Sequence, residues 1–250
     1  MIDDYYKTMY ELEDNYWWFV ALRNFVDSYL KLQNQNKETL DILDAGCGTG
    51  ALLQKISKSH NAIGIDISQH NLSYCKKRSL KNILKGSVSH LPFKDNKFDL
   101  ITSLDVLCCL QASDDVNALR EFYRVLKFDG TLILNLPAFE FLRSEHDKAT
   151  NLRTRYSRNN LQQKLRLAGF KISRITYRNT FLFPLVMIYR LMKKNLKAAG
   201  ESESDLKPIP NFVNNALIEL LKVENLLLKK LNLPFGSSVF SAAFKTRELL

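Results

Sequence analysis

The stretch LDAGCGTGA, residues 43–51, decides the fold class of this chain. Apolar residues over 39–44 read as a short strand before it, and residues 51–59 have the composition of a helix. Glycines directly after a strand let the backbone turn tightly and approach a ligand, and the next helix offers its first N–H groups to a negative group. The stretch therefore predicts a strand, a ligand-binding turn and a helix.

The same order of elements continues along the chain. Strands are predicted over 61–67, 81–87, 98–105 and 131–136, and helices lie between them over 68–80 and 114–126. Strands that alternate with helices of about ten to fifteen residues specify a parallel sheet with helices on both faces. We therefore expect an α/β fold with a doubly wound, mainly parallel sheet.

The pattern changes after residue 140. A helix over 157–168, closed by Gly169, leads to a strand over 170–177, and a last strand is predicted over 237–245. The segment between these strands is mostly helical, and insertions on a rigid scaffold often carry specificity. Polar breaks are expected at 33–37 and 200–204. We divide the chain into an N-terminal helical lid, a ligand-binding core, a helical insertion or cap and the final strand of the core, at residues 1–37, 38–180, 181–235 and 236–250.

The net charge of +10 arises in one segment of the chain. Residues 1–139 carry 16 Lys and Arg against 17 Asp and Glu, residues 140–199 carry 14 against 3, and residues 200–250 carry 6 against 6. A charge that served solubility alone would be spread along the chain. The concentration over 140–199 indicates an anionic partner, such as a phosphate-bearing substrate, a nucleic acid or lipid headgroups.

The first residues, MIDDYYKTMYELED, are acidic and polar where a secretory signal would be basic and then apolar. We expect a cytoplasmic protein. The four cysteines show no C-x-x-C pair and no histidine at metal-ligand spacing, so we expect reduced thiols in the core and no metal site. The adjacent Cys108 and Cys109 could alternatively form a ligand or redox pair.

The glycine pattern by itself fits two classes of ligand. Gly46-x-Gly48-x-x-Ala51, with Asp66 about twenty residues further on, satisfies the dinucleotide fingerprint. One interpretation is a nicotinamide-dependent oxidoreductase, which requires a Tyr/Lys or Cys/His hydride site that the sequence does not show. The other interpretation is a different adenosine ligand.

Four collinear stretches narrow this choice. Asp44, two residues before the first glycine, completes a stretch that resembles motif I of the class I S-adenosylmethionine-dependent methyltransferases. Residues 61–68 resemble the second strand of that family, residues 86–107 its adenine-binding loop and fourth strand, and residues 121–137 its next helix and fifth strand. The resemblance covers roughly residues 38–138. It implies a Rossmann-like sheet of seven strands and S-adenosylmethionine as the methyl donor.

The resemblance also implies which residues contact the donor. Asp66 would bind both ribose hydroxyls, and Ser87 would stand at the adenine amino group, where the family often has Asp. A serine hydroxyl can still accept a hydrogen bond from an amine. The expected donor contacts are Trp18, Arg23, Asp44, Ala45, Gly46, Cys47, Gly48, Gly50, Asp66, Ile67, Ser87, Val88, Leu104 and Asp105.

The only two tryptophans of the chain are adjacent and precede the sheet. Trp17-Trp18-Phe19 with Arg23, together with residues 144–170 and 233–240, is similar to a subgroup of bacterial class I enzymes associated with cell-surface saccharide and natural-product pathways. In such enzymes the leading helices lie over the cofactor. Neighbours on a helix point about 100° apart. We expect Trp18 nearer the donor, Trp17 packed on protein and Arg23 at the methionine carboxylate, although the two tryptophans could exchange roles.

Candidate catalytic residues lie after the fourth and fifth strands. Methyl transfer is an in-line displacement, so the protein must align acceptor and donor and exclude water, and a general base helps where the acceptor is a hydroxyl. His146 is the expected base or substrate contact, with an exposed loop histidine as the alternative. Asp105 is expected to face the ligand crevice or to cap a helix. Tyr156 is the third candidate. Cys108-Cys109 stand where the family frequently has Glu-His or His-His, which removes a common acid/base candidate.

The basic segment leaves three classes of partner open. We expect methylation of an O or N acceptor on a small molecule or saccharide-linked metabolite, and Arg143, Arg153, Arg155 and Arg158 could bind a phosphate on it. The alternative is a nucleic-acid-binding methyltransferase or a catalytically silent binding module, but the sequence lacks an aromatic and basic single-strand platform. Residues 181–197 fit an interfacial helix at a membrane surface or, alternatively, core or dimer contacts. The oligomeric state stays open.

Overall fold

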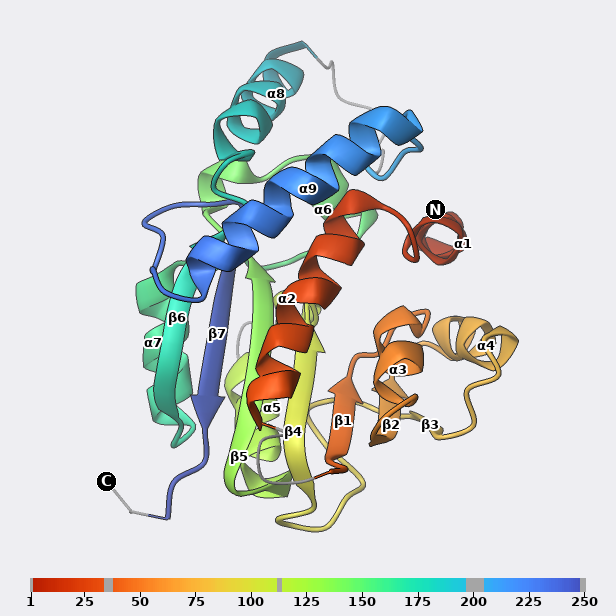
Figure 1. Cartoon of the computed structure of the whole chain (residues 1–250), viewed down its shortest axis with the longest axis vertical. Coiled ribbons are helices and arrows are strands. Elements are labelled where there is room, and N and C mark those ends of the chain that lie inside the picture. The colour runs from red at the N-terminus through yellow and green to blue at the C-terminus, as the bar shows by residue number, and fades with distance from the viewer. Residues whose placement is uncertain (1, 34–37, 112–113, 197–204, 248–250) are drawn as a thin grey trace.

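Seven strands form one sheet in the order β3-β2-β1-β4-β5-β7-β6 (Figure 1). The computed structural model describes residues 2–33, 38–111, 114–196 and 205–247. The strands are β1 (Asp41–Ala45), β2 (Asn61–Asp66), β3 (Ile83–Lys85), β4 (Phe98–Leu104), β5 (Leu126–Pro137), β6 (Lys171–Arg178) and β7 (Ser238–Phe244). The order reverses between β1 and β4, near the middle of the sheet.

The strand directions identify the edge of the sheet at which a ligand is expected to bind, called the ligand edge below. β1 pairs in parallel with β2 and with β4, and β4 pairs in parallel with β5. β7 lies between β5 and β6 and is antiparallel to both. In doubly wound sheets, ligands bind outside the carboxyl ends of the strands at the point where the strand order reverses. The residues that follow β1, β2 and β4 are therefore placed to form a site.

Helices cover both faces of the sheet. They are α1 (Ile2–Leu12), α2 (Trp17–Gln33), α3 (Ala51–Ile56), α4 (Gln69–Lys77), α5 (Asp114–Val125), α6 (Glu145–Ala149), α7 (Arg158–Leu167), α8 (Phe183–Leu196) and α9 (Asn211–Leu228), with 3-10 turns η2 (Leu107–Cys109) and η3 (Glu140–Leu142). One apolar cluster includes Phe122 of α5 and Leu161 of α7. A second cluster includes Phe25 of α2, Leu53 of α3 and Leu228 of α9. Burial of each such side chain contributes about 1.5–3 kcal/mol, so both faces stabilise the sheet.

The helical insertion packs on the amino-terminal helices. α9 lies along α2 in front of the sheet (Figure 1). The side-chain oxygen of Asn214 accepts from the N–H of Trp17 at 2.8 Å, and its amide nitrogen donates to the carbonyl of Asn15 at 2.8 Å. The first N–H groups of a helix have no partner within the helix. Asn214 supplies one, so α9 helps to fix where α2 begins.

The predicted fold class is confirmed, and the observed elements start and end within a few residues of the predicted ones, with one exception. β5 begins at Leu126, where a helix was predicted to end, because its pairing with β4 shifts register between Phe98 and Leu100. This irregular start includes Asp129 at a φ of 65°. The predicted polar breaks fall mostly outside the described residues. No helix in the described part of the chain is long and apolar enough to cross a membrane.

Candidate functional site

The glycine turn between β1 and α3 is held against the end of β2. The N–H groups of Gly46 and Cys47 both donate to the carbonyl of Ile65, at 2.7 and 3.0 Å. Gly46, Gly48 and Gly50 have φ of 84°, 55° and 92°. A left-handed backbone costs most other residues about 1–2 kcal/mol. A Cβ on Gly46 would also lie 2.2 Å from Cγ2 of Val106, so the turn keeps this shape only with glycine there.

Asp66, the last residue of β2, binds the glycine turn directly. Its Oδ2 accepts from the N–H of Gly48 at 2.9 Å, and its Oδ1 accepts from the N–H of Ser68 at 2.8 Å and from Nδ2 of Asn71 at 3.2 Å. Burial raises the pKa of this carboxyl, and these three hydrogen bonds lower it. A carboxylate can accept about four hydrogen bonds. Asp66 therefore orders the turn and keeps capacity for a further donor.

Asp44 of β1 is a carboxyl group buried close to the turn. It is 3% exposed, and its Oδ1 accepts from the hydroxyl of Thr102 in β4 at 2.8 Å. Burial raises the pKa of Asp44 to about 7; the hydrogen bond from Thr102 opposes this shift, and the charges of Asp66 and Glu13 add to it. Burial therefore disfavours the ionised form of Asp44, and a cation bound beside it would favour that form.

Asp105 follows β4 in a strained conformation. Its φ is 57°, in a region that only a few residue types tolerate. Its Oδ1 accepts from Nδ2 of Asn135 at 3.0 Å, and its own N–H donates to the Asn135 carbonyl at 2.8 Å. Burial raises the pKa of Asp105 to about 6, against the hydrogen bond from Asn135 and the charges of Arg178 and Arg155. Backbone strain of this kind is concentrated at functional sites.

Three neighbouring strands thus bring carboxyl groups to one edge of the sheet, of which Asp44 and Asp66 are buried and Asp105 is partly buried. Asp44, Asp66 and Asp105 all have pKa values raised by burial, so each would be stabilised by a positively charged ligand. Beside them Ile67 is 71% exposed and offers an apolar surface to a flat ring. The other predicted donor contacts lie nearby along the chain: Ala45 and Leu104 end β1 and β4, and Ser87 and Val88 follow β3.

α1 covers this edge. Cε of Met9 lies 3.3 Å from the position that a Cβ on Gly48 would take. The ring of Tyr5 lies edge-on to the ring of His146, with centroids 6.2 Å apart. Burial raises the pKa of Tyr5, and the charge of Asp105 adds to the shift. Met9 and Tyr5 therefore place α1 against both the glycine turn and α6.

Two buried charges tie the end of α1 to the glycine turn. Glu13 is 4% exposed, accepts from the hydroxyl of Thr49 and pairs with Arg78 at 2.9 Å. Nε of Arg78 donates to the Thr49 carbonyl at 3.0 Å, and its guanidinium lies 4.8 Å from the ring centroid of Tyr10. Sequence reasoning missed Glu13 and Arg78, because they are 65 residues apart and belong to no motif.

His146 lies in α6 beside Tyr5. Its Nδ1 accepts from the N–H of Asp205 at 3.1 Å. Burial lowers the pKa of His146, so the imidazole is neutral at neutral pH, with its proton on Nε2. In this arrangement His146 can donate a hydrogen bond to an acceptor molecule. To act as a base, the imidazole would first have to release the Asp205 N–H, so the predicted role as base stays a prediction.

In the structure, several residues that were predicted to contact the substrate are bound to other residues of the protein. Tyr156 is 1% exposed, and its hydroxyl donates to Asp115 at 3.0 Å, which holds it in the core. Both oxygens of Asp147 accept from Arg155 at 2.6 Å, so the guanidinium fork expected to bind phosphate is occupied within the protein. Arg143 pairs with Glu140 in the same way. The first ion pair holds α6, and the second holds η3, which comes just before α6.

The tryptophan pair forms the first two residues of α2. Trp17 packs on an apolar cluster with Ala21 and Leu182, as predicted for one of the two rings. The ring of Trp18 meets that of Trp17 edge-on, with centroids 5.7 Å apart. Arg23 donates to the carbonyls of Glu13 and Asp14, the second at 2.7 Å, and so closes the turn between α1 and α2. The predicted contacts of Trp18 and Arg23 with the donor stay predictions.

The cysteines are free thiols, and Cys47, Cys75 and Cys108 are buried. The sulfur atoms of Cys108 and Cys109 lie 3.9 Å apart. Within the described residues, no cluster of His, Cys, Asp and Glu side chains could hold a metal ion.

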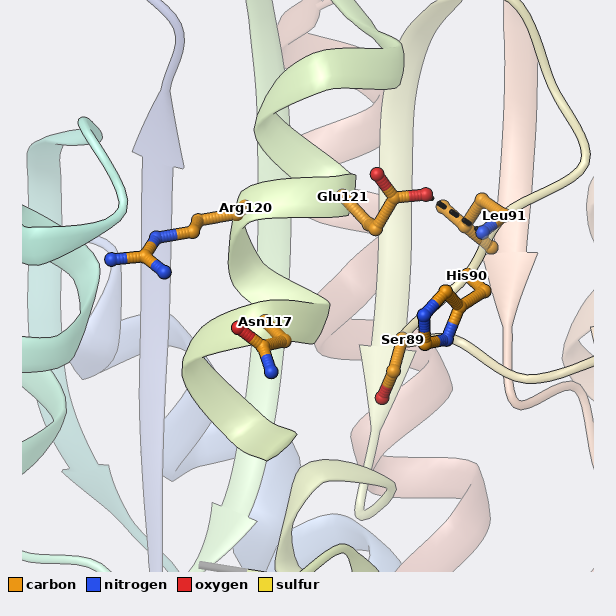
Figure 2. A pocket seen from close by; sticks show the side chains of 6 residues that line it. All are labelled: Ser89, His90, Leu91, Asn117, Arg120 and Glu121. Carbon is orange, nitrogen blue, oxygen red and sulfur yellow. Dashed lines mark hydrogen bonds between the residues drawn. The ribbon is translucent and has the colours of Figure 1, made fainter. Parts of the chain in front are cut away.

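A surface pocket of about 550 Å³ lies between α5 and the loop after β3 (Figure 2). His90 and Ser89 of the loop face Asn117 and Glu121 of α5, and Glu121 accepts from the N–H of Leu91 at 2.8 Å. The residues that line this pocket include none of the predicted site residues. We therefore assign the site to the glycine turn.

The fold and the carboxyl groups at its ligand edge define a Rossmann-like methyltransferase sheet, and a comparison with protein families agrees. Residues 43–134 match the family described as "Methyltransferase domain". This match supports, for this part of the chain, a methyltransferase that takes its methyl group from S-adenosylmethionine.

Known relatives cover part of the chain. It is 36% identical over 140 residues to an uncharacterized protein of Methanocaldococcus jannaschii. The aligned region covers 53% of this chain and 59% of that protein. It is 38% identical over 99 residues to a demethylmenaquinone methyltransferase of Lactobacillus johnsonii, which covers 35% of this chain and 40% of that enzyme. The chain thus spans about half the length of these relatives. A solved S-adenosylmethionine-dependent methyltransferase of Thermotoga maritima shares the fold, with a TM-score of 0.58, 20% identity and coverage of 96% and 99% of the two chains.

S-adenosylmethionine fits the residues at this edge. Its sulfonium and ammonium groups are cations, and the buried carboxyl groups favour cations. Asp44 would hold the methionine end, Asp66 the ribose hydroxyls, and Ile67 and Ser87 the adenine ring. When bound, this molecule supplies an electrophilic methyl group.

We expect the affinity for S-adenosylmethionine to rise at least about tenfold between pH of about 5.5 and 7.5. The pKa values of about 7 for Asp44 and about 6 for Asp105 mean that both carboxyl groups must lose protons before they can face a cation. Calorimetry in buffers of different ionisation enthalpy would measure both affinity and proton release.

Because these pKa values lie above those of exposed Asp, the free protein should also lose stability as pH rises through this range. Asp44→Asn should flatten both profiles, and an unchanged slope in that variant would contradict the assignment.

Proposed function

We propose that this chain transfers the methyl group of S-adenosylmethionine to an O or N acceptor on a small molecule or saccharide-linked metabolite. The observation that carries the proposal is the glycine turn bound by Asp66 and flanked by the buried carboxyl group of Asp44 and the partly buried one of Asp105. The match of residues 43–134 to a methyltransferase domain supports the reaction.

The protein's part in this reaction is alignment and exclusion of water. Displacement at a sulfonium carbon needs the acceptor atom in line with the departing sulfur, and a closed site prevents competing water from entering. α1 is placed to close the crevice through Tyr5 and Met9. His146 of α6 lies beside Tyr5 and is the histidine placed to contact an acceptor. An amine acceptor needs less help from a base than a hydroxyl does.

Part of the positive charge of residues 140–199 is not available to a nucleic acid. Arg178 is 1% exposed, Arg155 is bound by Asp147, and Arg174 donates to the carbonyls of Lys229 and Leu231. These cations of the 140–199 segment are already bound within the protein or buried. Nucleic-acid binding depends on cations that reach the phosphates at the surface. The net charge of +11 in this segment therefore overstates the charge that a phosphate backbone would meet.

Asp66→Ala should weaken the binding of both S-adenosylmethionine and S-adenosylhomocysteine by about 10- to 100-fold. Each hydrogen bond to a charged group contributes about 1.5–3 kcal/mol, and the variant also leaves the N–H of Gly48 without its acceptor. Isothermal titration calorimetry would measure the loss, with a nicotinamide cofactor as the competing ligand. Asp95→Ala, which removes a carboxylate with 65% side-chain exposure, should bind as the parent does. Parent protein that binds neither sulfur ligand, or an Asp66→Ala variant that binds them normally, would contradict the proposal.

A further inference from the structure

One face of α8 exposes a stripe of large apolar side chains. Leu185, Ile188, Tyr189 and Met192 are 66%, 51%, 52% and 58% exposed. Their spacing of three, four and seven residues places them on one side of the helix. Single exposed apolar residues are common on proteins, but an aligned set of this size marks an interaction surface.

Aromatic residues at the base of α8 extend this apolar surface. Phe183, the first residue of α8, contacts the rings of Phe141 and Phe235, with centroids 6.3 and 5.5 Å apart. Phe141 is 54% exposed and Phe235 is 42% exposed. We call the exposed residues of α8 together with Phe141 and Phe235 the α8 surface. It therefore draws on three separate segments of the chain.

The charge of this segment has one sign. Residues 181–197 contain Arg190, Lys193, Lys194 and Lys197 and no acidic residue. Arg190 is held by the protein, since it donates to the Leu142 carbonyl at 2.7 Å. The three lysines follow the apolar stripe along the chain. An apolar helical face combined with lysines is the pattern of helices that lie in the headgroup region of anionic membranes.

α9 offers an internal comparison. Phe212, Val223 and Leu226 are 77%, 53% and 61% exposed, so α9 also shows apolar side chains. Its sequence, however, contains Glu219 and Glu224 against a single Lys222. An anionic surface would gain nothing from this charge. Lys229 and Lys230 follow directly after α9, but of these two segments only that of α8 combines exposed apolar side chains with several basic residues and no acidic one.

We propose that the α8 surface docks on an anionic lipid bilayer, with α8 lying in the plane of the headgroups. α8 projects beyond the end of the sheet toward which the arrows of β1, β4 and β5 point (Figure 1). Arg190 links α8 to η3, which follows β5 at that same end. Docking in this way brings the edge that carries the site toward the bilayer. The proposal does not depend on the identity of the methyl acceptor.

A second copy of the chain fits this surface less well than a bilayer does. A twofold contact through α8 would set the same surface on both chains. Both chains would then bring the net positive charge of residues 181–197 to one interface, and like charges brought together at an interface oppose association. An anionic bilayer satisfies both the apolar stripe and the lysines.

Co-sedimentation with vesicles tests this proposal. The full chain is incubated with vesicles of phosphatidylcholine alone or of phosphatidylcholine mixed with phosphatidylglycerol, at low and high salt. We expect binding to the anionic vesicles that weakens with salt. Leu185→Gln/Ile188→Gln/Met192→Gln should bind at least about tenfold more weakly, since apolar burial is lost. Lys193→Gln/Lys194→Gln should lose about fivefold for each lysine.

The controls separate a specific surface from general stickiness. Val223→Gln/Leu226→Gln on α9 should bind vesicles as the parent does. If the apolar α8 variant fails to fold, as judged by circular dichroism, the lysine variant carries the same prediction. A parent that ignores anionic vesicles at low salt, or an α9 variant that loses as much binding as the α8 variants, would overturn the proposal. So would a parent dimer, seen by light scattering, that the α8 substitutions dissociate.

Discussion

Gly46→Ala is expected to abolish detectable binding of S-adenosylmethionine and to lower the free energy of unfolding by about 2–5 kcal/mol. A left-handed conformation costs an alanine about 1–2 kcal/mol, and overpacking of a fitted site costs about 1–3 kcal/mol more. Here the new Cβ would lie 2.2 Å from Cγ2 of Val106, a side chain with little freedom to turn. Relief requires the turn to move, which would displace the N–H of Gly48 from Asp66. Denaturant unfolding and calorimetry measure the two effects.

Gly169→Ala provides the matched control. Gly169 also has a positive φ, of 94°, but lies between α7 and β6, and its Cβ would meet Tyr123 at 3.2 Å. This variant should lose stability and keep its donor affinity. Gly46→Ala/Val106→Ala should recover the part of the loss that comes from the clash. Donor affinity that falls equally in Gly169→Ala and Gly46→Ala would show that lost stability alone explains the effect.

Local sequence patterns predicted the fold well where a strand is a short apolar run bounded by polar or turn residues. β4, over Phe98–Leu104, and β7, over Ser238–Phe244, lie almost where their apolar residues predicted them. β5 shows the limit of such patterns. Its irregular start depends on pairing with β4 and β7, and no local signal distinguishes Asp129-Gly130 in a strand from the same pair in a turn.

The sequence predicts the parts of the site that belong to one local motif. It does not predict the parts formed by contacts between distant segments of the chain. The glycine turn follows from the spacing of Gly46, Gly48 and Gly50, and an acid at the end of the second strand follows from the strand itself. The supporting positions of Tyr156 and Arg155 depend on Asp115 and Asp147, and sequence reasoning could not pair them in advance. An arginine in a basic segment looks the same whether it faces solvent or a buried carboxylate.

Arg78→Met is expected to cost about 3–5 kcal/mol of stability and to weaken donor binding. The side chains of Arg78 and Glu13 are 6% and 5% exposed, and breaking a buried ion pair leaves the remaining charge without compensation. Burial already raises the pKa of Glu13, while Thr49 and Arg78 oppose that shift. Without Arg78, the end of α1 would lose its attachment to the glycine turn. Chemical denaturation and calorimetry measure the two losses, and hydrogen exchange over residues 5–12 reports the release of α1.

Two further variants separate the buried pair from the charges around it. Glu13→Gln/Arg78→Met removes both charges and should recover much of the stability, because replacing a whole buried pair costs far less than breaking it. Asp14→Asn removes the second carboxylate partner of Arg78. The side chain of Asp14 is 52% exposed, so this substitution should lower the free energy of unfolding by less than about 1 kcal/mol. If Arg78→Met costs no more than Asp14→Asn, the buried pair contributes little. If the double variant regains stability but keeps its weak donor binding and fast exchange in α1, then the attachment of α1 to Thr49 serves the site rather than the fold.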